Sequence, residues 1–222
     1  MRIISWNVNG LRAVYRKNFL EWLQDSSADV VCLQEIKTQR QQLAFSFDPS
    51  GYISFFNPAV KKGYAGVAIY TKILPMLIKK KIGLERFDDE GRILQLEYPH
   101  FTLINLYLPH GGRKKENLGY KLEVYSSLLK YLKKLKNEKV IVAGDFNIAH
   151  QEIDLARPKG NKNNIMFTPQ EREQIDKLTE LGFIDSFRKF HPGGGHYTWW
   201  PYRLNARQRN LGWRIDYLFV SR

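Results

Sequence analysis

The chain has 222 residues, of which 43% are hydrophobic and 26% charged, a composition typical of a globular protein that excludes a disordered chain. Its 35 Lys and Arg residues outnumber its 22 Asp and Glu residues, and the formal charge of +13 predicts a polyanionic partner, either nucleic acid or an anionic membrane surface. The single cysteine, Cys32, excludes an internal disulfide and a multi-cysteine zinc site.

Eight short segments rich in β-branched and aromatic residues predict strands. In chain order they span residues 2–8, 29–36, 52–57, 66–71, 93–98, 101–108, 139–144 and 213–220. A short helix is predicted around Phe19, Trp22 and Leu23. A second helix is predicted from Asn117 to Lys136, where apolar residues recur every three or four positions and lysines occupy the other face.

A third helix is predicted from the capping signals around "TPQE". Thr168 can cap its first turn, Pro169 suits the first helical position, Glu171 completes a capping box and Gly182 ends it. Some strands are neighbours in hairpins and others flank a helix, so we expect an α/β fold with a pair of mixed sheets and helices outside. No linker or repeat marks a boundary, so residues 1–222 are predicted to form one domain.

The amino terminus reaches polar residues by its fifth position, too early for a signal peptide, and no apolar run approaches the length of a membrane span. We therefore expect a protein without membrane association. Its predicted location is the cytoplasm, or the nucleus in a eukaryote.

Polar residues follow several predicted strands at the points where they end. Asn7 follows "IISW", Glu35 follows "VVCLQ", Tyr107 lies in "LINLYLP", and Asp145 and Asn147 follow "VIVAG". Strand ends that border one site can hold side chains in a fixed geometry. Residues two apart in an extended chain share a face, which predicts Asp145 and Asn147 on one side and Phe146 in the core.

Carboxylate and carboxamide groups, all oxygen donors, dominate this set of residues. Such donors suit a hard divalent cation such as Mg²⁺, which takes one or two protein carboxylates and keeps several waters. With a basic surface, the matching substrate is a phosphodiester attacked by water with the help of the metal. We therefore expect Mg²⁺ as the cofactor, with Mn²⁺ as an alternative.

Six motifs, in this order, resemble the exonuclease III family of abasic-site endonucleases within the endonuclease/exonuclease/phosphatase superfamily, and the resemblance covers the chain from Arg2 onward. They are "SWNVNGLRA", "LQEIK", "YLPHGGR", "GDFNIAHQEIDLARPKGNKNNIMFTPQE", "YTWWPYR" and "NLGWRIDYLFVS". The resemblance implies a four-layer α/β sandwich, with two mixed sheets face to face and helices outside. It also implies cleavage of double-stranded DNA on the 5′ side of abasic sites, with further 3′-to-5′ exonuclease and 3′-phosphodiesterase activity.

The resemblance also implies a role for each residue of the candidate site. Glu35 would be the principal metal ligand, and Asn7 would help to hold the metal or a phosphate oxygen. Asp145 would orient or deprotonate the attacking water, and Asn147 would hydrogen-bond the nucleophile or the transition state. Tyr107 would contact the scissile phosphate, and Asp216 resembles the acidic residue that positions a catalytic histidine.

A second set of residues matches the family's DNA-binding positions. Five basic residues would contact phosphates, and three apolar residues would line the pocket for the abasic deoxyribose, which costs least to extrude from the duplex because it lacks a base. The basic set is Arg12, Lys37, Arg113, Arg157 and Lys159, and the apolar set is Trp199, Trp213 and Ile215.

In the family, the catalytic histidine belongs to a Ser-Asp-His motif beyond the segment "DYLFVS", and none of the five histidines of this sequence stands in that motif. We expect from this a chain that is incomplete at its carboxyl end, without its final strand, and weakly active or inactive by itself. A complete protein would be a monomer, and for a truncated one completion by another chain stays open. Two other functions stay open: a module that binds abasic DNA without cutting it, and a phosphatase or phospholipase of the same superfamily.

Overall fold

The computed structural model describes residues 1–42, 49–135 and 138–222, which fall into two compact units. Unit 1 comprises residues 1–107 and 138–145, and unit 2 comprises residues 108–137 and 146–222. Among the described residues, no helix has the length and hydropathy that a membrane crossing requires. That residues 1–222 form one domain stays a prediction.

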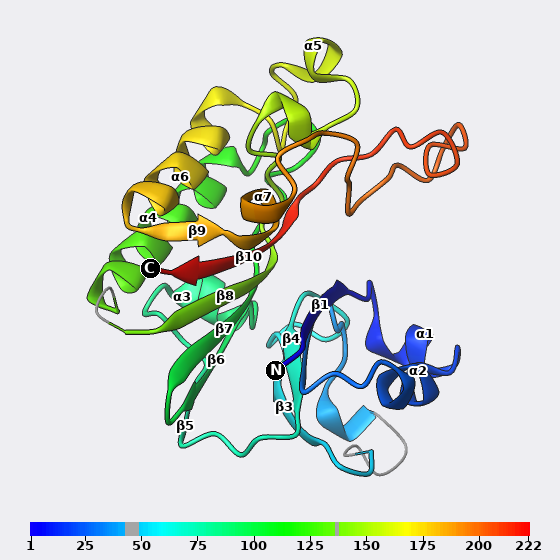
Figure 1. The fold of residues 1–222 in the computed structure, drawn as a ribbon, viewed down its shortest axis with the longest axis vertical. Helices are drawn as coiled ribbons and strands as arrows, with labels where there is room; N and C mark the ends of the chain where they lie inside the picture. Colours follow the sequence, from blue (N-terminus) through cyan, green and yellow to red (C-terminus); the bar gives the residue numbers. More distant parts are fainter. Residues whose placement is uncertain (43–48, 136–137) are drawn as a thin grey trace. The chain divides into compact units, whose positions relative to one another are not determined.

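The first sheet of unit 1 is mixed and has the strand order β1-β2-β4-β3 (Figure 1). Strands β1 and β2 are parallel, whereas β4 pairs antiparallel with both β2 and β3. The strands are β1 (Ile3–Asn7), β2 (Val30–Gln34), β3 (Ile53–Asn57) and β4 (Val67–Thr71). Cys32 is buried in β2 as a core residue.

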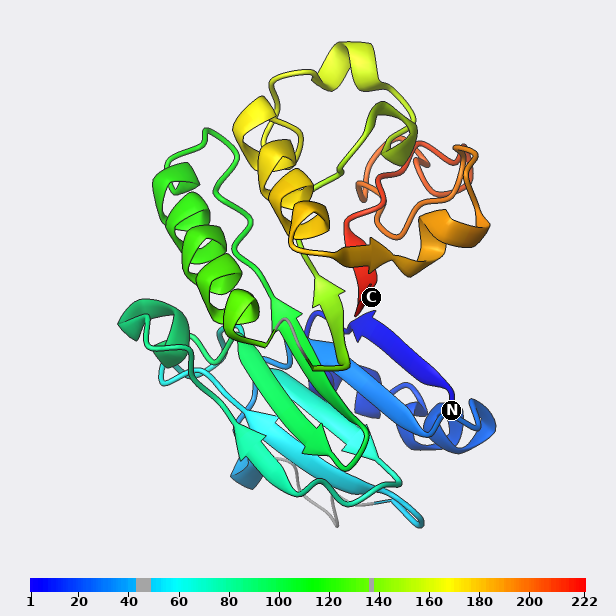
Figure 2. The same ribbon diagram turned by 60° about the vertical axis from the view of Figure 1, so that its left-hand side comes forward.

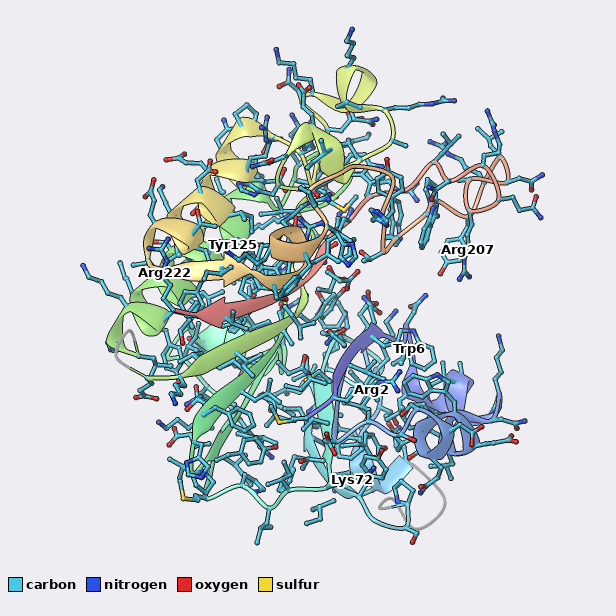
Figure 3. The ribbon with its side chains drawn as sticks, in the orientation of Figure 1. Arg2, Trp6, Lys72, Tyr125, Arg207 and Arg222 are labelled. Atoms are coloured by element: carbon cyan, nitrogen blue, oxygen red, sulfur yellow. The ribbon has the colours of Figure 1, made fainter. Side chains whose placement is uncertain are left out.

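Helices α1 (Leu11–Tyr15) and α2 (Phe19–Asp25) cover one face of this sheet, and the short helix η1 (Arg40–Gln42) follows β2. Trp6 of β1, labelled in Figure 3, packs edge-on against Trp22 of α2 with ring centroids 4.8 Å apart. This apolar layer between helices and sheet is a hydrophobic core of unit 1.

The second sheet of unit 1 runs in the order β5-β6-β7-β8 and is also mixed, because β6 pairs antiparallel with β5 and β7 while β7 and β8 are parallel (Figure 2). Its strands are β5 (Leu77–Lys79), β6 (Ile93–Tyr98), β7 (Phe101–Tyr107) and β8 (Val140–Asp145), and the short helix α3 (Glu85–Asp89) precedes β6.

The two sheets pack face to face, and a buried polar network joins them at the centre. The side chain of Asn105 in β7 accepts a hydrogen bond from Gln34 Nε2 (2.7 Å) and donates to the carbonyls of Leu33 (3.0 Å) and Ala68 (2.9 Å). Asn105 and Gln34 are completely buried. Because an unpaired buried polar group is costly, this network fixes how one sheet is aligned on the other.

Unit 2 contains two long helices, α4 (Leu118–Lys134) and α6 (Pro169–Glu180), which lie side by side in both ribbon views (Figures 1 and 2). The predicted capping box of α6 is present, with Thr168 and Glu171 bonded reciprocally. The shorter elements are η2 (Glu152–Asp154), α5 (Pro158–Asn161), β9 (Phe183–Asp185), α7 (Ser186–Phe190) and β10 (Asp216–Ser221), and β9 pairs antiparallel with β10.

A buried ion-pair cluster holds the segment that leads into β10. Arg214 Nε donates to Asp154 Oδ1 (2.8 Å) and its Nη2 donates to Asp185 Oδ2 (2.7 Å), while Arg188 also donates to Asp154. The Arg214 guanidinium lies 4.3 Å from the centroid of the Tyr217 ring. Burial by itself would raise the pKa of Asp154, but the hydrogen bonds from Arg214 and Arg188 outweigh it and lower that pKa.

All eight predicted strands and all three predicted helices are present, and the α/β class with two mixed sheets is confirmed. Strands β5 and β9 were not predicted because each has only three residues, too few for an alternating pattern. The predicted end of the second helix at Lys136 lies outside the described residues. The prediction that the lysines of this helix face away from the core is wrong for Lys121, which is completely buried.

Replacing Asn105 tests the contact between the sheets. We expect Asn105→Ala to lower the free energy of unfolding by about 3 kcal/mol, because Gln34 and two carbonyls lose partners in the interior. Chemical denaturation measures this change. Asn163→Ala, at an exposed loop position, is the control and should stay within about 0.5 kcal/mol of the wild type. An equal effect of the two substitutions would contradict the role of the network.

Replacing Asp154 tests the cluster in unit 2. The folded-state pKa of Asp154 is depressed, so its stabilising contribution is present above the unfolded-state value of about 4 and is lost as the pH falls through the folded-state value. Asp154→Asn should therefore cost about 3 kcal/mol at pH 7, because Arg214 loses a buried partner. It should also weaken the dependence of stability on pH below about pH 4. Denaturation series at pH 7 and pH 3 measure both effects, and a variant as acid-sensitive as the wild type would exclude this role.

Candidate active site

Four of the predicted site residues lie at the carboxyl ends of strands in unit 1. Asn7 ends β1, Glu35 directly follows β2, Tyr107 ends β7 and Asp145 ends β8. In each sheet the two strands concerned are parallel neighbours, with Asn7 opposite Gln34 and Tyr107 opposite Asp145. Parallel neighbours end at the same edge of a sheet, so each sheet presents two polar residues together.

Asn7 joins the two sheets at this edge through its side-chain amide. Its Nδ2 donates to Glu35 Oε1 (2.8 Å) and to Asp145 Oδ2 (2.9 Å). Its Oδ1 accepts from the backbone N–H of Asn9 (3.0 Å), and this bond fixes which end of the amide faces the carboxylates. A single amide therefore holds two carboxylates, from different sheets, at hydrogen-bonding distance from one atom.

The surroundings of Glu35 keep its carboxylate charged. Its Oε2 forms an ion pair with Lys37 Nζ (2.8 Å), and the side chain of Tyr107 is a further neighbour that lowers its pKa. Burial would raise the pKa of Glu35, but Lys37, Asn7 and Tyr107 together outweigh burial and lower it. Glu35 is thus an anion at neutral pH, and a cation already stands beside it.

Tyr107 keeps its proton in this site. Burial raises the pKa of Tyr107 far above its ordinary value, and the negative charge of Glu35 raises it further. The phenol is therefore protonated and a hydrogen-bond donor at neutral pH. A neutral donor next to Glu35 can hold a carboxylate or a phosphate oxygen without adding charge.

Gly144 delivers Asp145 to the edge of the sheet. Its φ is +144°, and a Cβ at this position would lie 2.0 Å from the carbonyl oxygen of Leu106. Only glycine therefore allows β8 to approach β7 so closely one residue before Asp145. Phe146, on the other side, is completely buried against Tyr217 and Phe219, as predicted.

Asn147 belongs to unit 2, and its backbone differs from the expectation. Its φ is +52°, so the chain is not extended at this residue, and the argument that Asp145 and Asn147 share a face of a strand is wrong. Asx residues tolerate this left-handed conformation when local hydrogen bonds hold them. Asn147 Nδ2 donates to the carbonyl of Leu108 (2.9 Å), which fixes the buried side chain.

A buried lysine on α4 also bonds the backbone at Asn147. Lys121 Nζ donates to the carbonyl of Asn147 (2.7 Å) and forms an ion pair with Glu171 of α6 (2.6 Å). The sequence analysis missed this residue, although its spacing contains the signal: Lys121 lies three residues after Leu118 and four before Tyr125, within the apolar stripe of the helix.

The three predicted pocket residues of unit 2 lie at one apolar cluster. Trp213 is 9% exposed and Ile215 3% exposed, and both belong to an apolar cluster with Phe167, against which the half-buried Trp199 packs. Asp216 begins β10, and its backbone N–H donates to Thr198. That Trp213, Ile215 and Trp199 line a pocket for the abasic deoxyribose stays a prediction.

The predicted phosphate contacts divide into two groups. Arg12 in unit 1, and Arg113, Arg157 and Lys159 in unit 2, are exposed, as a polyanion-binding role requires. Lys37 instead lies in the site itself, bonded to Glu35 and to the side chain of Asn9.

The oxygen donors at this edge fit a hard divalent cation. Glu35 and Asp145 supply two carboxylates, which matches the one or two that Mg²⁺ takes from a protein, and the ammonium of Lys37 on Glu35 shows that the carboxylate accepts a cation. Within residues 1–42, 49–135 and 138–222, no group of three or more His, Cys, Asp and Glu side chains is placed to hold a metal. Water and substrate oxygens would complete the coordination.

Comparison with known proteins identifies the family of this site. Residues 4–222 match the Endonuclease/Exonuclease/phosphatase family. The chain is 47% identical to an exodeoxyribonuclease of Bacillus subtilis over 224 residues, covering 100% of the chain and 88% of that protein.

Solved structures agree with the sequence comparison. An AP endonuclease from Archaeoglobus fulgidus has a TM-score of 0.91 and 32% identity, covering 100% of this chain and 87% of that one. A 3′ phosphatase from Neisseria bound to a product DNA hairpin has a TM-score of 0.92 and 29% identity, covering 100% of this chain and 86% of that one. The chain therefore belongs to the endonuclease/exonuclease/phosphatase family, in its branch of exodeoxyribonucleases and AP endonucleases.

Proposed function

We propose that this chain is a divalent-metal-dependent nuclease that hydrolyses the phosphodiester on the 5′ side of an abasic site in double-stranded DNA. The observation that carries the proposal is the amide of Asn7, which holds Glu35 and Asp145 together at the ends of strands from two sheets. Such a pair of fixed carboxylates suits the binding of a metal and the activation of water in one site.

Glu35 would be the principal ligand of the metal, for which Mg²⁺ is proposed and Mn²⁺ is the alternative. When bound, the metal would supply positive charge to the phosphoryl oxygens as charge develops on them. Asn7 contributes by orienting the carboxylates, since its amide nitrogen faces them and its oxygen is engaged by Asn9. Lys37, now paired with Glu35, would be available to a phosphate oxygen when the metal binds.

The roles proposed for the remaining polar residues follow the family resemblance. Asp145 accepts a proton from the attacking water or orients it, and Tyr107 donates a hydrogen bond to the scissile phosphate. Asn147, fixed by Leu108 and Lys121, would hydrogen-bond the nucleophile or the transition state. The family resemblance implies that Asp216 positions a catalytic histidine, although none of the five histidines of this sequence stands in the family's Ser-Asp-His motif.

The charge and the relatives support DNA as the substrate. The formal charge of +13 favours a polyanion, and the four exposed basic residues Arg12, Arg113, Arg157 and Lys159 suit contacts with phosphates. The name of one relative specifies AP endonuclease activity and that of another a 3′ phosphatase with bound DNA. We propose 3′-to-5′ exonuclease and 3′-phosphodiesterase activity as further reactions of the same site.

Incision of an abasic duplex tests the function. With Mg²⁺ the chain should cut a labelled duplex on the 5′ side of one abasic site, with no cut in the intact duplex or with a chelator. Glu35→Gln should lower the incision rate by about 10²-fold or more. It should also lower the affinity for the metal, because the variant loses a charged ligand. Glu21→Gln, an exposed change on α2, is the matched control and should keep the wild-type rate. Binding without any incision, with Mg²⁺ or Mn²⁺, would sink the proposal.

Asp145→Asn separates catalysis from binding. It keeps the shape of the side chain but removes the charge and the proton-accepting oxygen, so the single-turnover rate should fall by about 10²- to 10⁴-fold. The affinity for abasic duplex should change by less than about threefold, because the phosphate contacts that dominate it are untouched. Filter binding and quenched-flow incision measure the two quantities. A near-normal rate would overturn the role assigned to Asp145.

A further inference from the structure

Arg92, which directly precedes β6, is a buried cation beside the candidate active site, and the assigned site does not include it. It is 4% exposed, and each of its three nitrogen atoms donates a hydrogen bond: Nε to Glu90 Oε2 (2.5 Å), Nη1 to the carbonyl of Tyr107 (3.0 Å) and Nη2 to the Tyr64 hydroxyl (3.1 Å). These three bonds, to Glu90, Tyr107 and Tyr64, fix the orientation of the planar guanidinium.

Arg92 controls both the backbone and the ring of Tyr107. Its carbonyl accepts the Tyr107 N–H (2.9 Å), its Nη1 donates to the Tyr107 carbonyl, and its guanidinium carbon lies 4.5 Å from the centroid of the Tyr107 ring. A tyrosine side chain has two torsion angles, so holding the backbone and one face of the ring fixes where the hydroxyl points. The Tyr107 hydroxyl and the Glu35 carboxylate are neighbours that shift each other's pKa.

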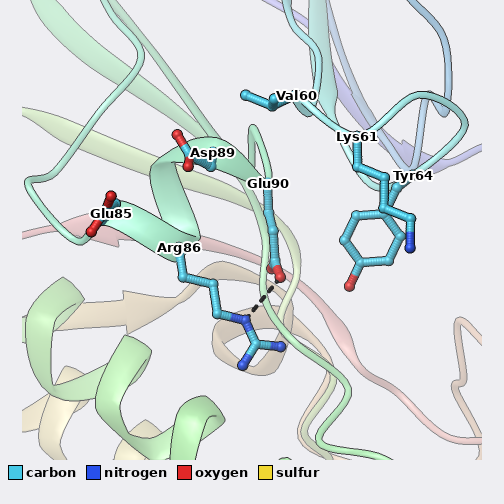
Figure 4. A pocket seen from close by; sticks show the side chains of 7 residues that line it. All are labelled: Val60, Lys61, Tyr64, Glu85, Arg86, Asp89 and Glu90. Atoms are coloured by element: carbon cyan, nitrogen blue, oxygen red, sulfur yellow. Dashed lines mark hydrogen bonds and ion pairs between the residues drawn. The ribbon is translucent and has the colours of Figure 1, made fainter.

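Two partners of Arg92, Glu90 and Tyr64, reach the surface of unit 1. Glu90 accepts from Arg86 Nε (3.1 Å) with its other oxygen, and Figure 4 shows this pair at the wall of a hollow of about 410 Å³. Tyr64, which bonds Arg92, lines the same hollow. Of the two arginines bonded to Glu90, Arg92 contacts Tyr107 and is buried, whereas the Arg86 side chain is 54% exposed.

A purely structural role would not require a charge at this position. Burial lowers the pKa of a guanidinium, and here the bonded carboxylate of Glu90 counteracts that effect, so that the pKa of Arg92 is raised. An apolar residue of similar volume is often as stabilising as a buried ion pair. A buried cation with a hydrogen bond from each of its three nitrogen atoms is better explained by the orientation that these bonds impose.

We propose that Arg92 is a positioning residue: it orients the Tyr107 hydroxyl and, through it, the Glu35 carboxylate. This inference rests on the proposed nuclease function for its kinetic consequence, but the arrangement of Glu90, Arg92, Tyr107 and Glu35 is independent of the substrate.

Arg92→Lys tests the proposal, because lysine keeps the charge but lacks the planar fork. The single-turnover incision rate on an abasic duplex should fall about tenfold, with the dissociation constant for that duplex changed less than twofold. The Mg²⁺ dissociation constant, measured by calorimetry without DNA, should rise about threefold. Arg86→Lys, which alters the other partner of Glu90, is the matched control and should change none of the three quantities.

A double-mutant cycle separates positioning from general stability. In a Tyr107→Phe background, Arg92→Lys should change neither the incision rate nor the Mg²⁺ affinity further, because the hydroxyl that it orients is absent. Equal effects in both backgrounds, or a wild-type rate and Mg²⁺ affinity in Arg92→Lys, would overturn the proposal.

Failure of the two proposals can be told apart. If the wild-type chain does not incise abasic DNA, the proposed function fails, and the cycle on Mg²⁺ affinity still decides the role of Arg92. If Arg92→Lys does not fold, Glu90→Gln takes its place, since it leaves Arg92 intact but removes the carboxylate charge that holds it. The same loss of rate and Mg²⁺ affinity, again absent in the Tyr107→Phe background, is then expected.

Discussion

The site depends on one amide that donates to two carboxylates. Asn7 Nδ2 lies within 2.9 Å of Glu35 and Asp145, residues 110 positions apart in the sequence, one on each sheet of unit 1. Two carboxylates this close would repel each other, and the amide protons between them, with Lys37 on one side, reduce that repulsion. The face-to-face packing of the sheets through Asn105 sets the distance that makes this sharing of one donor group feasible.

Both sheets of unit 1 bring polar residues together by the same arrangement of strands. In each sheet a parallel pair ends level, so a polar residue that follows one strand lies beside the polar residue that follows its neighbour. The glycine before Asp145 allows the second pair to approach closely, and the left-handed conformation of Glu35, with φ +51°, turns the chain away from the sheet directly after β2. The course of the backbone therefore brings these polar side chains to one edge of each sheet.

The sequence predicted this part of the protein well because apolar strand patterns end visibly at Asn7, Glu35, Tyr107 and Asp145. It failed where burial contradicts residue type. Arg92 and Lys121 are cations, which are typically exposed, and only their bonds to carbonyls and carboxylates reveal that they are interior residues. The φ of Asn147 could not be predicted either, because a two-residue repeat says nothing about a chain that leaves the strand at that point.

In both units the buried charges occur next to chain segments that must keep one conformation. Arg92 bonds the carbonyl of Tyr107 in unit 1, and Lys121 bonds the carbonyl of Asn147 in unit 2. Each cation is paired with a carboxylate, Glu90 or Glu171, so the cost of burying it is offset locally. Such pairs add little net stability, so we attribute their effect to orientation. A hydrogen bond from a fixed cation restricts the rotation of the carbonyl group, and with it the backbone of Tyr107 or Asn147. The polar groups proposed to act on the phosphate are in this way held by other polar groups that never need to reach it.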